Sequence, residues 1–438
     1  MRFVPVALLA LSSALASAQR FPEPAGPPLV VTSDIDRFWE AYDRVVAEPD
    51  SAERVRLLDS LYVQPGTPGL QAMVARRNLT AADYAEAILR YPRFWTSVRP
   101  NVTQADQHAR QIAAGIDGLR ALYPALRCAR VYFTVGALRT NGMTLGDVVF
   151  IGSEVALADS ATVTDEFAGP LSHLPAYFAS NPAASVAFLN VHEVVHTQQG
   201  PFGDDLLAMA LQEGVAEFVA ALATCRPSPT PAVAYGEANE DRVREAFALD
   251  MFGSLASFWL WSNAENAFGV RDLGYYVGYA IAERYYERSA DKAAAVADLI
   301  ELDYRDPEAV DALVTASGYF ARPVGAMRAE APHVVGVEGM ENGAQDLAPG
   351  PRTVTFEFSQ PMNPDLRGFD YGPLGADHVL RVERVAGWSE DGRRLTVEVA
   401  LAQNRRHQVL VTSQFRSPDG VRLVPYLVDV TTGAGEVE

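Results

Sequence analysis

The sequence predicts an α+β protein in which a mostly helical region with a small β-sheet is followed by an all-β sandwich. Before Pro332, apolar residues recur at steps of three and four through most segments, as they do in helices. After Pro332 they alternate with polar residues, as they do in strands. The composition, 49% hydrophobic and 21% charged over 438 residues, indicates a folded chain of roughly two or three domains. It excludes a disordered tail, a collagen and a coiled coil.

The N-terminal residues 1–18 have the pattern of a secretory signal peptide. An early positive charge is followed by a short apolar run and then by Ala16-Ser17-Ala18, an A-x-A cleavage site. The run is too short to span a bilayer, and no Cys follows it for lipid attachment. We therefore expect a secreted or periplasmic protein without a membrane span.

Charge and cysteine content restrict the partners and the covalent framework. The net charge of −19 would repel a phosphate backbone, so nucleic acid is not an expected partner. The chain has two cysteines, Cys128 and Cys225, which is too few for a disulfide framework. In an oxidising compartment they could pair, or they could be two separate buried thiols.

The helical region begins at Ser33, where apolar residues follow helical spacing through Val46. Thr80 and Asp83 form a capping box that opens a later helix, and 112–122 has helical spacing again. The β-branched and aromatic runs 129–135 and 148–152 predict a pair of strands on either side of the turn-rich segment 139–146.

Beyond this sheet, one helix is expected from Pro182 to Gln199, with Asn181 as its cap and Gly200-Pro201 as its stop. Alternating strands at 354–358 and 395–401, with Asp391-Gly392 and Asp419-Gly420 as turn signals, predict a sandwich of roughly a hundred residues. The predicted domains are therefore 19–331 and 333–435.

The chemistry-bearing motif is His192-Glu193-Val194-Val195-His196, inside the predicted helix. His192 and His196 lie about one turn apart, so both imidazoles can take corners of a tetrahedral zinc site. Glu193 is rotated by roughly 100° around the axis, where a general base would lie beside the metal rather than on it. The alternative is an exposed helix face, which the apolar neighbours Val191, Val194 and Val195 disfavour.

The next predicted helix, capped by Asp204-Asp205, contains Glu213-Gly214-Val215-Ala216-Glu217. Glu213 and Glu217 share one face, and Gly214 is expected to let the two helices approach closely. Glu213 can complete the ligand set, while Glu217 is either an acceptor for the distal N–H of a ligating histidine or a solvated carboxylate. Two imidazoles and one carboxylate leave an open position for water, as in catalytic zinc sites, and predict one Zn²⁺ per chain.

This arrangement resembles the gluzincin clan of zinc metallopeptidases, in which HExxH is followed on a second helix by a Glu ligand. More narrowly, Glu213-Gly214-Val215-Ala216-Glu217-Phe218, the strand pair before the first helix and Gly274-Tyr275-Tyr276-Val277-Gly278-Tyr279 look like the predicted zinc peptidases related to gliding-motility lipoprotein B. The resemblance covers about residues 125–290. It implies a zincin-like peptidase domain, with His192, His196 and Glu213 as ligands and Glu193 as base.

The resemblance carries two further expectations. It would place 141–149 along the edge of the site as a strand that pairs with substrate, although a plain hairpin is an equal alternative. A tyrosine on the helix 274–288 could donate to the oxyanion, and Tyr276 and Tyr279 are the candidates, unless they are core aromatics. The chain departs from the gliding protein in having no acylation Cys, so a role in motility is not implied.

The C-terminal segment resembles a bacterial immunoglobulin-like domain, and such modules usually act as spacers or adhesive appendages. Together, the motifs predict a secreted zinc metallopeptidase that hydrolyses peptide or protein substrates through a zinc-held water activated by Glu193. Two alternatives remain open. The zincin-like domain could be inactive in a surface or adhesion protein that binds through the Ig-like domain, or the zinc centre could hydrolyse a non-peptide substrate.

Overall fold

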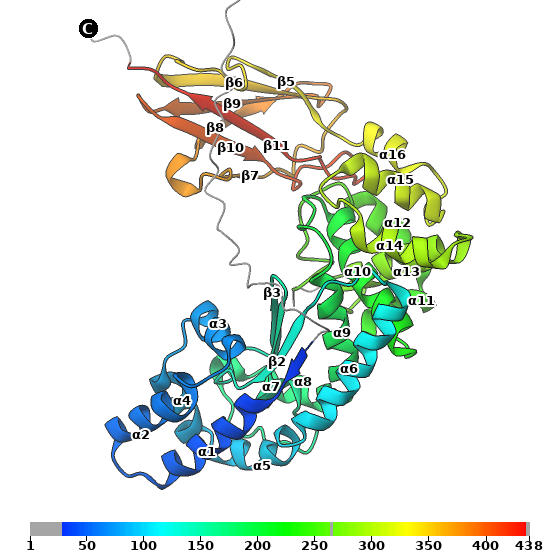
Figure 1. The fold of residues 1–438 in the computed structure, drawn as a ribbon. Helices are drawn as coiled ribbons and strands as arrows, with labels where there is room; N and C mark the ends of the chain where they lie inside the picture. The colour runs from blue at the N-terminus through cyan, green and yellow to red at the C-terminus, as the bar shows by residue number, and fades with distance from the viewer. Residues whose placement is uncertain (1–28, 263–265, 435–438) are drawn as a thin grey trace, which may run out of the picture. The chain divides into compact units, whose positions relative to one another are not determined.

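The computed structural model describes residues 29–262 and 266–434 of the chain. The predicted signal peptide, residues 1–18, lies outside the described residues. The predicted α+β fold class is confirmed, because helices dominate the chain up to residue 330 and antiparallel sheets make up the C-terminal region (Figure 1).

The helices are α1 Ser33–Ala47, α2 Ser51–Leu58, α3 Pro68–Arg77, α4 Ala81–Arg90, α5 Pro92–Val102, α6 Ala105–Leu122, α7 Ser153–Ala156, α8 Leu174–Ala179, α9 Val186–His196, α10 Leu206–Thr224, α11 Pro231–Ala238, α12 Glu240–Asp250, α13 Leu273–Arg288, α14 Lys292–Glu301, α15 Pro307–Ser317 and α16 Val324–Glu330. The strands are β1 Leu29–Val31, β2 Arg130–Thr134, β3 Gly142–Leu145, β4 Val148–Gly152, β5 Val334–Glu338, β6 Gly350–Phe358, β7 Phe369–Asp370, β8 Val382–Trp388, β9 Arg394–Leu401, β10 Arg406–Val411 and β11 Tyr426–Thr431.

The chain forms two compact units. The first comprises residues up to 198 together with 219–227, and the second comprises 199–218 together with the residues from 228 onward. Helix α10 is therefore shared, since its first part belongs to the second unit and its last turn and a half to the first.

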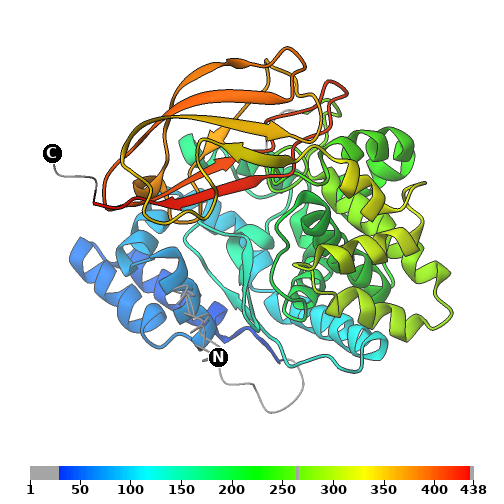
Figure 2. The same cartoon turned by 90° about the horizontal axis from the view of Figure 1, so that it is seen from above.

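In the first unit, the blue helices α1–α4 form one group (Figure 2). The predicted capping box at the start of α4 is present, because Thr80 and Asp83 each accept a hydrogen bond from the other's backbone N–H. The sheet has the order β1-β2-β4-β3, with β2 and β4 parallel. The predicted turn segment 139–146 contains the edge strand β3, which pairs antiparallel with β4.

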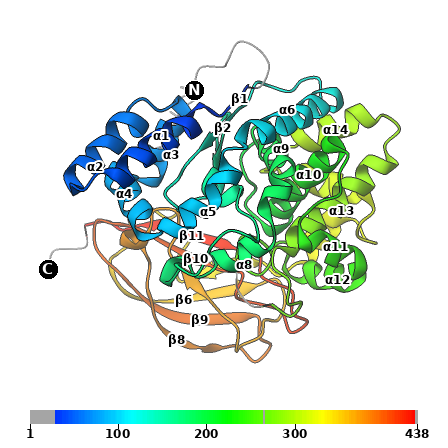
Figure 3. The same ribbon diagram turned by 90° about the horizontal axis from the view of Figure 1, so that it is seen from below.

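Glycine lets α6 pack closely in the first unit, where it runs beside α9 (Figure 3). A Cβ on Gly115 would meet Val191 at 2.5 Å, and one on Gly118 would meet the carbonyl oxygen of Ala223 at 2.1 Å. Any side chain at these positions would push α6 away from the HExxH helix and from the end of α10.

In the second unit, Gly214 and Gly278 bring α10 against α13. A Cβ on Gly278 would lie 1.9 Å from the carbonyl oxygen of Ala210, and one on Gly214 would lie 2.1 Å from the backbone of Gly278. The expectation that Gly214 lets α10 approach the HExxH helix is therefore wrong. Successive residues of a helix point about 100° apart, so the glycine after Glu213 faces a different neighbour.

The C-terminal sandwich consists of the sheets β5-β6-β9-β8 and β11-β10-β7. Strands β6 and β9 show the predicted alternation, with every second side chain buried from Val354 to Phe358 and from Leu395 to Leu401. Gly392 and Gly420, in the predicted turns, have φ of 70° and 90°. The inward side chains form one hydrophobic core between the sheets, as the sequence pattern requires.

The sequence left open whether Cys128 and Cys225 pair, and it predicted no membrane-spanning segment. The described residues contain no disulfide between Cys128 and Cys225, and Cys225 is exposed rather than buried. Helix α10 is long and apolar enough to cross a bilayer, but 83% of its most apolar stretch is buried inside the structure, as in the core helix of a folded domain.

Candidate metal centre

Helix α9 carries the HExxH motif on an almost fully buried element. A 3₁₀ turn at Pro182–Ser185 comes directly before it. The single helix expected from Pro182 is therefore a 3₁₀ turn followed by an α-helix. Asn181 adopts a left-handed conformation and its side chain makes no cap, contrary to expectation. The helix ends at His196, three residues earlier than predicted. In the residues that follow, the hydroxyl of Thr197 donates to Val194 and the side chain of Gln198 accepts from the backbone of Arg127.

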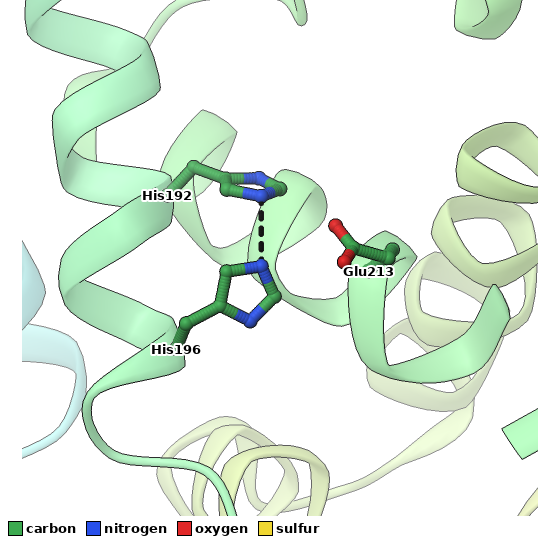
Figure 4. A group of neighbouring side chains, drawn as sticks. All are labelled: His192, His196 and Glu213. Carbon is green, nitrogen blue, oxygen red and sulfur yellow. Dashed lines mark hydrogen bonds between the residues drawn. The ribbon is translucent and has the colours of Figure 1, made fainter. Parts of the chain in front are cut away.

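The two histidines of the motif point their rings at each other. Their Nε2 atoms lie 3.0 Å apart (Figure 4). Two ligands of a tetrahedral zinc ion, each at ~2.0–2.1 Å, are separated by roughly 3.3 Å. The pair therefore has the spacing that one shared metal ion requires. His192 is 5% exposed, whereas His196 is partly accessible.

Glu213 of α10 supplies a carboxylate to the same point. The ligand atoms of His192, His196 and Glu213 all lie within 4.8 Å of one another, and Figure 4 shows the carboxylate facing the two imidazoles. Glu213 is only 4% exposed. Two imidazole nitrogens and one carboxylate oxygen are a donor set that suits zinc, so the residues fit the predicted metal.

Tyr275 on α13 holds this carboxylate in place, and the sequence reasoning missed it. Its side chain forms hydrogen bonds with Glu213 and Trp261. Burial, together with the charge of Glu213, raises the pKa of Tyr275 well above its ordinary value, so the phenol keeps its proton and donates a hydrogen bond to the carboxylate. Nothing in the sequence distinguishes Tyr275 from the other tyrosines of this helix, because the direction in which α13 faces depends on its packing.

Glu193, which follows His192 in the motif, is hydrogen-bonded to the sheet of the first unit. The hydroxyl of Thr144, on β3, donates a hydrogen bond to Oε2 of Glu193. Glu193 is partly accessible on a helix whose flanking valines are fully buried. The carboxylate is thus oriented by one hydroxyl while remaining open to solvent. The edge strand β3 lies within the segment 141–149 that was expected beside the site.

Glu217 is placed in a polar pocket of its own. It is 1% exposed, and its Oε1 accepts hydrogen bonds from the hydroxyls of Ser228 and Thr230. The solvated alternative for this carboxylate does not hold, since it is buried. Its assignment to a ligating histidine stays a prediction.

The two tyrosines named as oxyanion donors occupy different surroundings. Tyr276 is buried against Gly236 and donates to Glu240 at 3.1 Å. Tyr279 packs its ring edge-on against Phe218 at 5.5 Å, and burial raises its pKa to about 12. Their part in oxyanion binding stays a prediction, while Tyr275 is the tyrosine of this helix that contacts Glu213.

Comparisons with known proteins do not assign the chain to a family. No family model matches it, and no curated protein matches. Among solved structures, a match is "Crystal structure of the S-layer protein rSbsC(31-844)", at 13% sequence identity and a TM-score of 0.19. The alignment covers 92% of this chain and spans 45% of that one.

Proposed function

We propose that this protein is an exported zinc-dependent peptidase that hydrolyses peptide bonds in peptide or protein substrates. The observation that carries the proposal is the convergence of His192, His196 and Glu213 within 4.8 Å, next to a glutamate that the HExxH spacing leaves beside the ligands. Two imidazole nitrogens and one carboxylate oxygen that meet at one point are the donor set of catalytic zinc sites, which supports a metal-dependent activity.

In this proposal, the three residues hold one zinc ion, and Tyr275 fixes the orientation of the Glu213 carboxylate by hydrogen bonding. When bound, the ion supplies Lewis acidity that polarises the scissile carbonyl and lowers the pKa of a water toward ~7. The rest of the chemistry is proton transfer by the chain itself.

Glu193 is the proton carrier. The hydroxyl of Thr144 donates to its Oε2, which orients the carboxylate, and the carboxylate takes a proton from the attacking water. As the C–N bond breaks, Glu193 returns this proton to the leaving amine, and the carboxylate is restored. The water thereby adds OH to the carbonyl carbon and H to the nitrogen.

The test compares zinc-loaded wild-type protein with Glu193→Gln on a mixed peptide library, with products identified by mass spectrometry. Glu193→Gln should keep its zinc and lose about 10²–10⁴-fold in turnover, because the amide cannot accept the proton. Glu53→Gln, another partly accessible helical glutamate of the first unit, is the control and should keep full activity.

Three outcomes would count against the proposal. An active, zinc-loaded Glu193→Gln protein would overturn the role of Glu193. A zinc-loaded wild-type protein that cleaves no peptide would overturn the peptidase assignment and favour an inactive surface protein. Products from a non-peptide ester or amide, without peptide products, would make the protein a different zinc hydrolase.

A further inference from the structure

Two exposed aromatic side chains pack against each other in the second unit. Phe202, in the link between α9 and α10, is 41% exposed, and Trp261, between α12 and α13, is 49% exposed. Their rings meet edge to face, with centroids 5.5 Å apart. Single exposed aromatics are common on protein surfaces, whereas adjoining exposed aromatics form the kind of apolar patch that binding sites use.

The Phe202 side of the pair rests on a rigid link. Arg305 donates to the carbonyl oxygen of Phe202, and the adjacent Gly203 lies so close to Tyr304 that a Cβ would be 2.4 Å from its carbonyl oxygen. Gln199, which precedes this link, is buried and donates to the hydroxyl of Tyr304. Phe202 is therefore presented from a fixed backbone, which favours binding because little order is lost when a ligand arrives.

Trp261 is exposed, and its backbone adopts a conformation that a bulky residue disfavours. Trp261 has a φ of 55°, in the left-handed region that a bulky residue rarely adopts. Two residues earlier, Trp259 is buried and donates to Asp250 at 2.9 Å. Strained backbone of this kind persists where the surroundings enforce it, and it concentrates at ligand sites.

A chain of hydrogen bonds joins the pair to the candidate metal centre. Trp261 bonds to Tyr275, and Tyr275 bonds to Glu213. Each hydrogen bond spans about 3 Å, so the indole N–H lies within roughly 6 Å of the Glu213 carboxylate. Consecutive Cα atoms of a peptide are ~3.8 Å apart, so a residue next to the scissile bond can place its side chain on the pair.

We propose that Phe202 and Trp261 form a substrate subsite that binds a large apolar side chain, aromatic or branched aliphatic, next to the bond that is cleaved. The inference rests on the proposed peptidase function and adds the class of substrate. The edge of one ring and the face of the other give such a side chain apolar contact area. A small or charged side chain gains little from the same contact. Phe202 and Trp261 are accordingly specificity-determining residues.

The experiment uses two peptide series that differ only at the residues on either side of one cleavable bond, with Phe or Leu replaced by Ala or Ser. For zinc-loaded wild-type protein, kcat/KM should favour Phe or Leu at one of the two positions by about 10–100-fold. Phe202→Ala and Trp261→Ala should reduce this preference to a few-fold, mainly through KM, with zinc content unchanged.

A second readout does not need turnover. Fluorescently labelled peptides are titrated into zinc-loaded Glu193→Gln protein and binding is followed by anisotropy. The Phe peptide should bind at least 10-fold more tightly than the Ala peptide, and Phe202→Ala in the same background should remove the difference. Phe202→Leu, which keeps an apolar side chain, should retain part of the preference if the alanine variant does not fold.

Phe258→Ala is the matched control, because Phe258 is 42% exposed in the same segment but lines a different pocket with Leu249 and Arg416. It should leave the preference unchanged. If the wild type cleaves the peptides and both Phe202→Ala and Trp261→Ala keep its side-chain preference, the subsite is wrong. The proposed peptidase function is unaffected by that result. A wild-type protein that neither cleaves nor binds the peptides overturns the peptidase and the subsite with it.

Discussion

The core of the C-terminal sandwich and the core around α9 and α10 are built by opposite rules. Between the sheets, the inward positions are apolar, and the polar side chains alternate outward. Around α9 and α10, the polar side chains of His192, Glu213 and Glu217 are buried on helices whose other residues are mostly apolar. The first arrangement stabilises the fold by removing apolar surface from water, while the second needs hydrogen-bond partners or a bound ion to offset the lost hydration of its polar groups. The difference indicates where function lies.

The largest effect expected on stability is in the sandwich. Phe356 is 1% exposed and packs against Phe369, with ring centroids 5.7 Å apart. Phe356→Ala should lower the free energy of unfolding of the region by about 3–5 kcal/mol, because it leaves a cavity between the sheets. Zinc content, measured in the cold where the variant is folded, should equal that of the wild type.

The matched variant at the other region is His196→Ala. In metal-free protein it should change the unfolding free energy by less than about 1 kcal/mol, since it removes one of two crowded imidazoles, while zinc binding is lost. A loss of stability in metal-free His196→Ala as large as that in Phe356→Ala would show that the histidine pair is a structural contact. Denaturant unfolding of both variants makes the comparison.

Glu154 is a buried acid, like Glu213 and Glu217, but it does not belong to the candidate metal centre. Its carboxylate accepts hydrogen bonds from the backbone N–H groups of Gly136 and Leu138. Burial nevertheless raises its pKa from 4.5 to about 7. The unfolded chain ionises this group from about pH 4.5, whereas the folded chain keeps it protonated to about pH 7, so stability is lost as the pH rises through this window.

The difference of about 2.5 in pKa corresponds to roughly 3 kcal/mol. Measured from pH 4 to pH 8, the unfolding free energy of the wild type should fall by this amount relative to Glu154→Gln, which does not titrate. Parallel pH profiles for the two proteins would mean that Glu154 titrates normally. Subtracting the profiles cancels the contribution of every other titrating group.

A smaller effect is expected from the metal itself. Zinc at a hundred times its dissociation constant should raise the free energy of unfolding by about 2.7 kcal/mol, because it binds the folded site. The increase should be absent in His196→Ala, and Mg²⁺, which prefers oxygen ligands, should produce none in the wild type. An equal increase with Mg²⁺ would indicate binding to surface carboxylates.

Much of this architecture could be predicted from the sequence, because the determining signals are local. The capping box of Thr80 and Asp83, the alternation from Val354 to Phe358 and the HExxH spacing each depend on neighbouring residues. The face on which Glu213 lies also follows from helical periodicity, and the structure brings it to the two histidines.

The features that could not be predicted depend on contacts between distant segments. Thr144 reaches Glu193 only because β3 adds to the edge of a sheet, and the strand itself lies in a stretch rich in turn residues. Gly214 packs against Gly278 of α13 rather than against α9. On α13, Tyr275 rather than its neighbour Tyr276 forms the hydrogen bond with Glu213. A single sequence gives the periodicity of α13 but not the direction in which that helix faces.

We propose that His192, His196 and Glu213 hold one zinc ion. X-ray absorption at the zinc edge, with metal analysis of the same sample, measures the ligands of that ion. We expect about one zinc per chain with two imidazole nitrogens and carboxylate oxygen at ~2.0–2.2 Å, and no bound zinc in the double variant His192→Ala/His196→Ala. Two results would contradict this zinc site. One is wild-type protein that retains no zinc after dialysis against a zinc solution, and the other is a double variant that retains one equivalent of zinc.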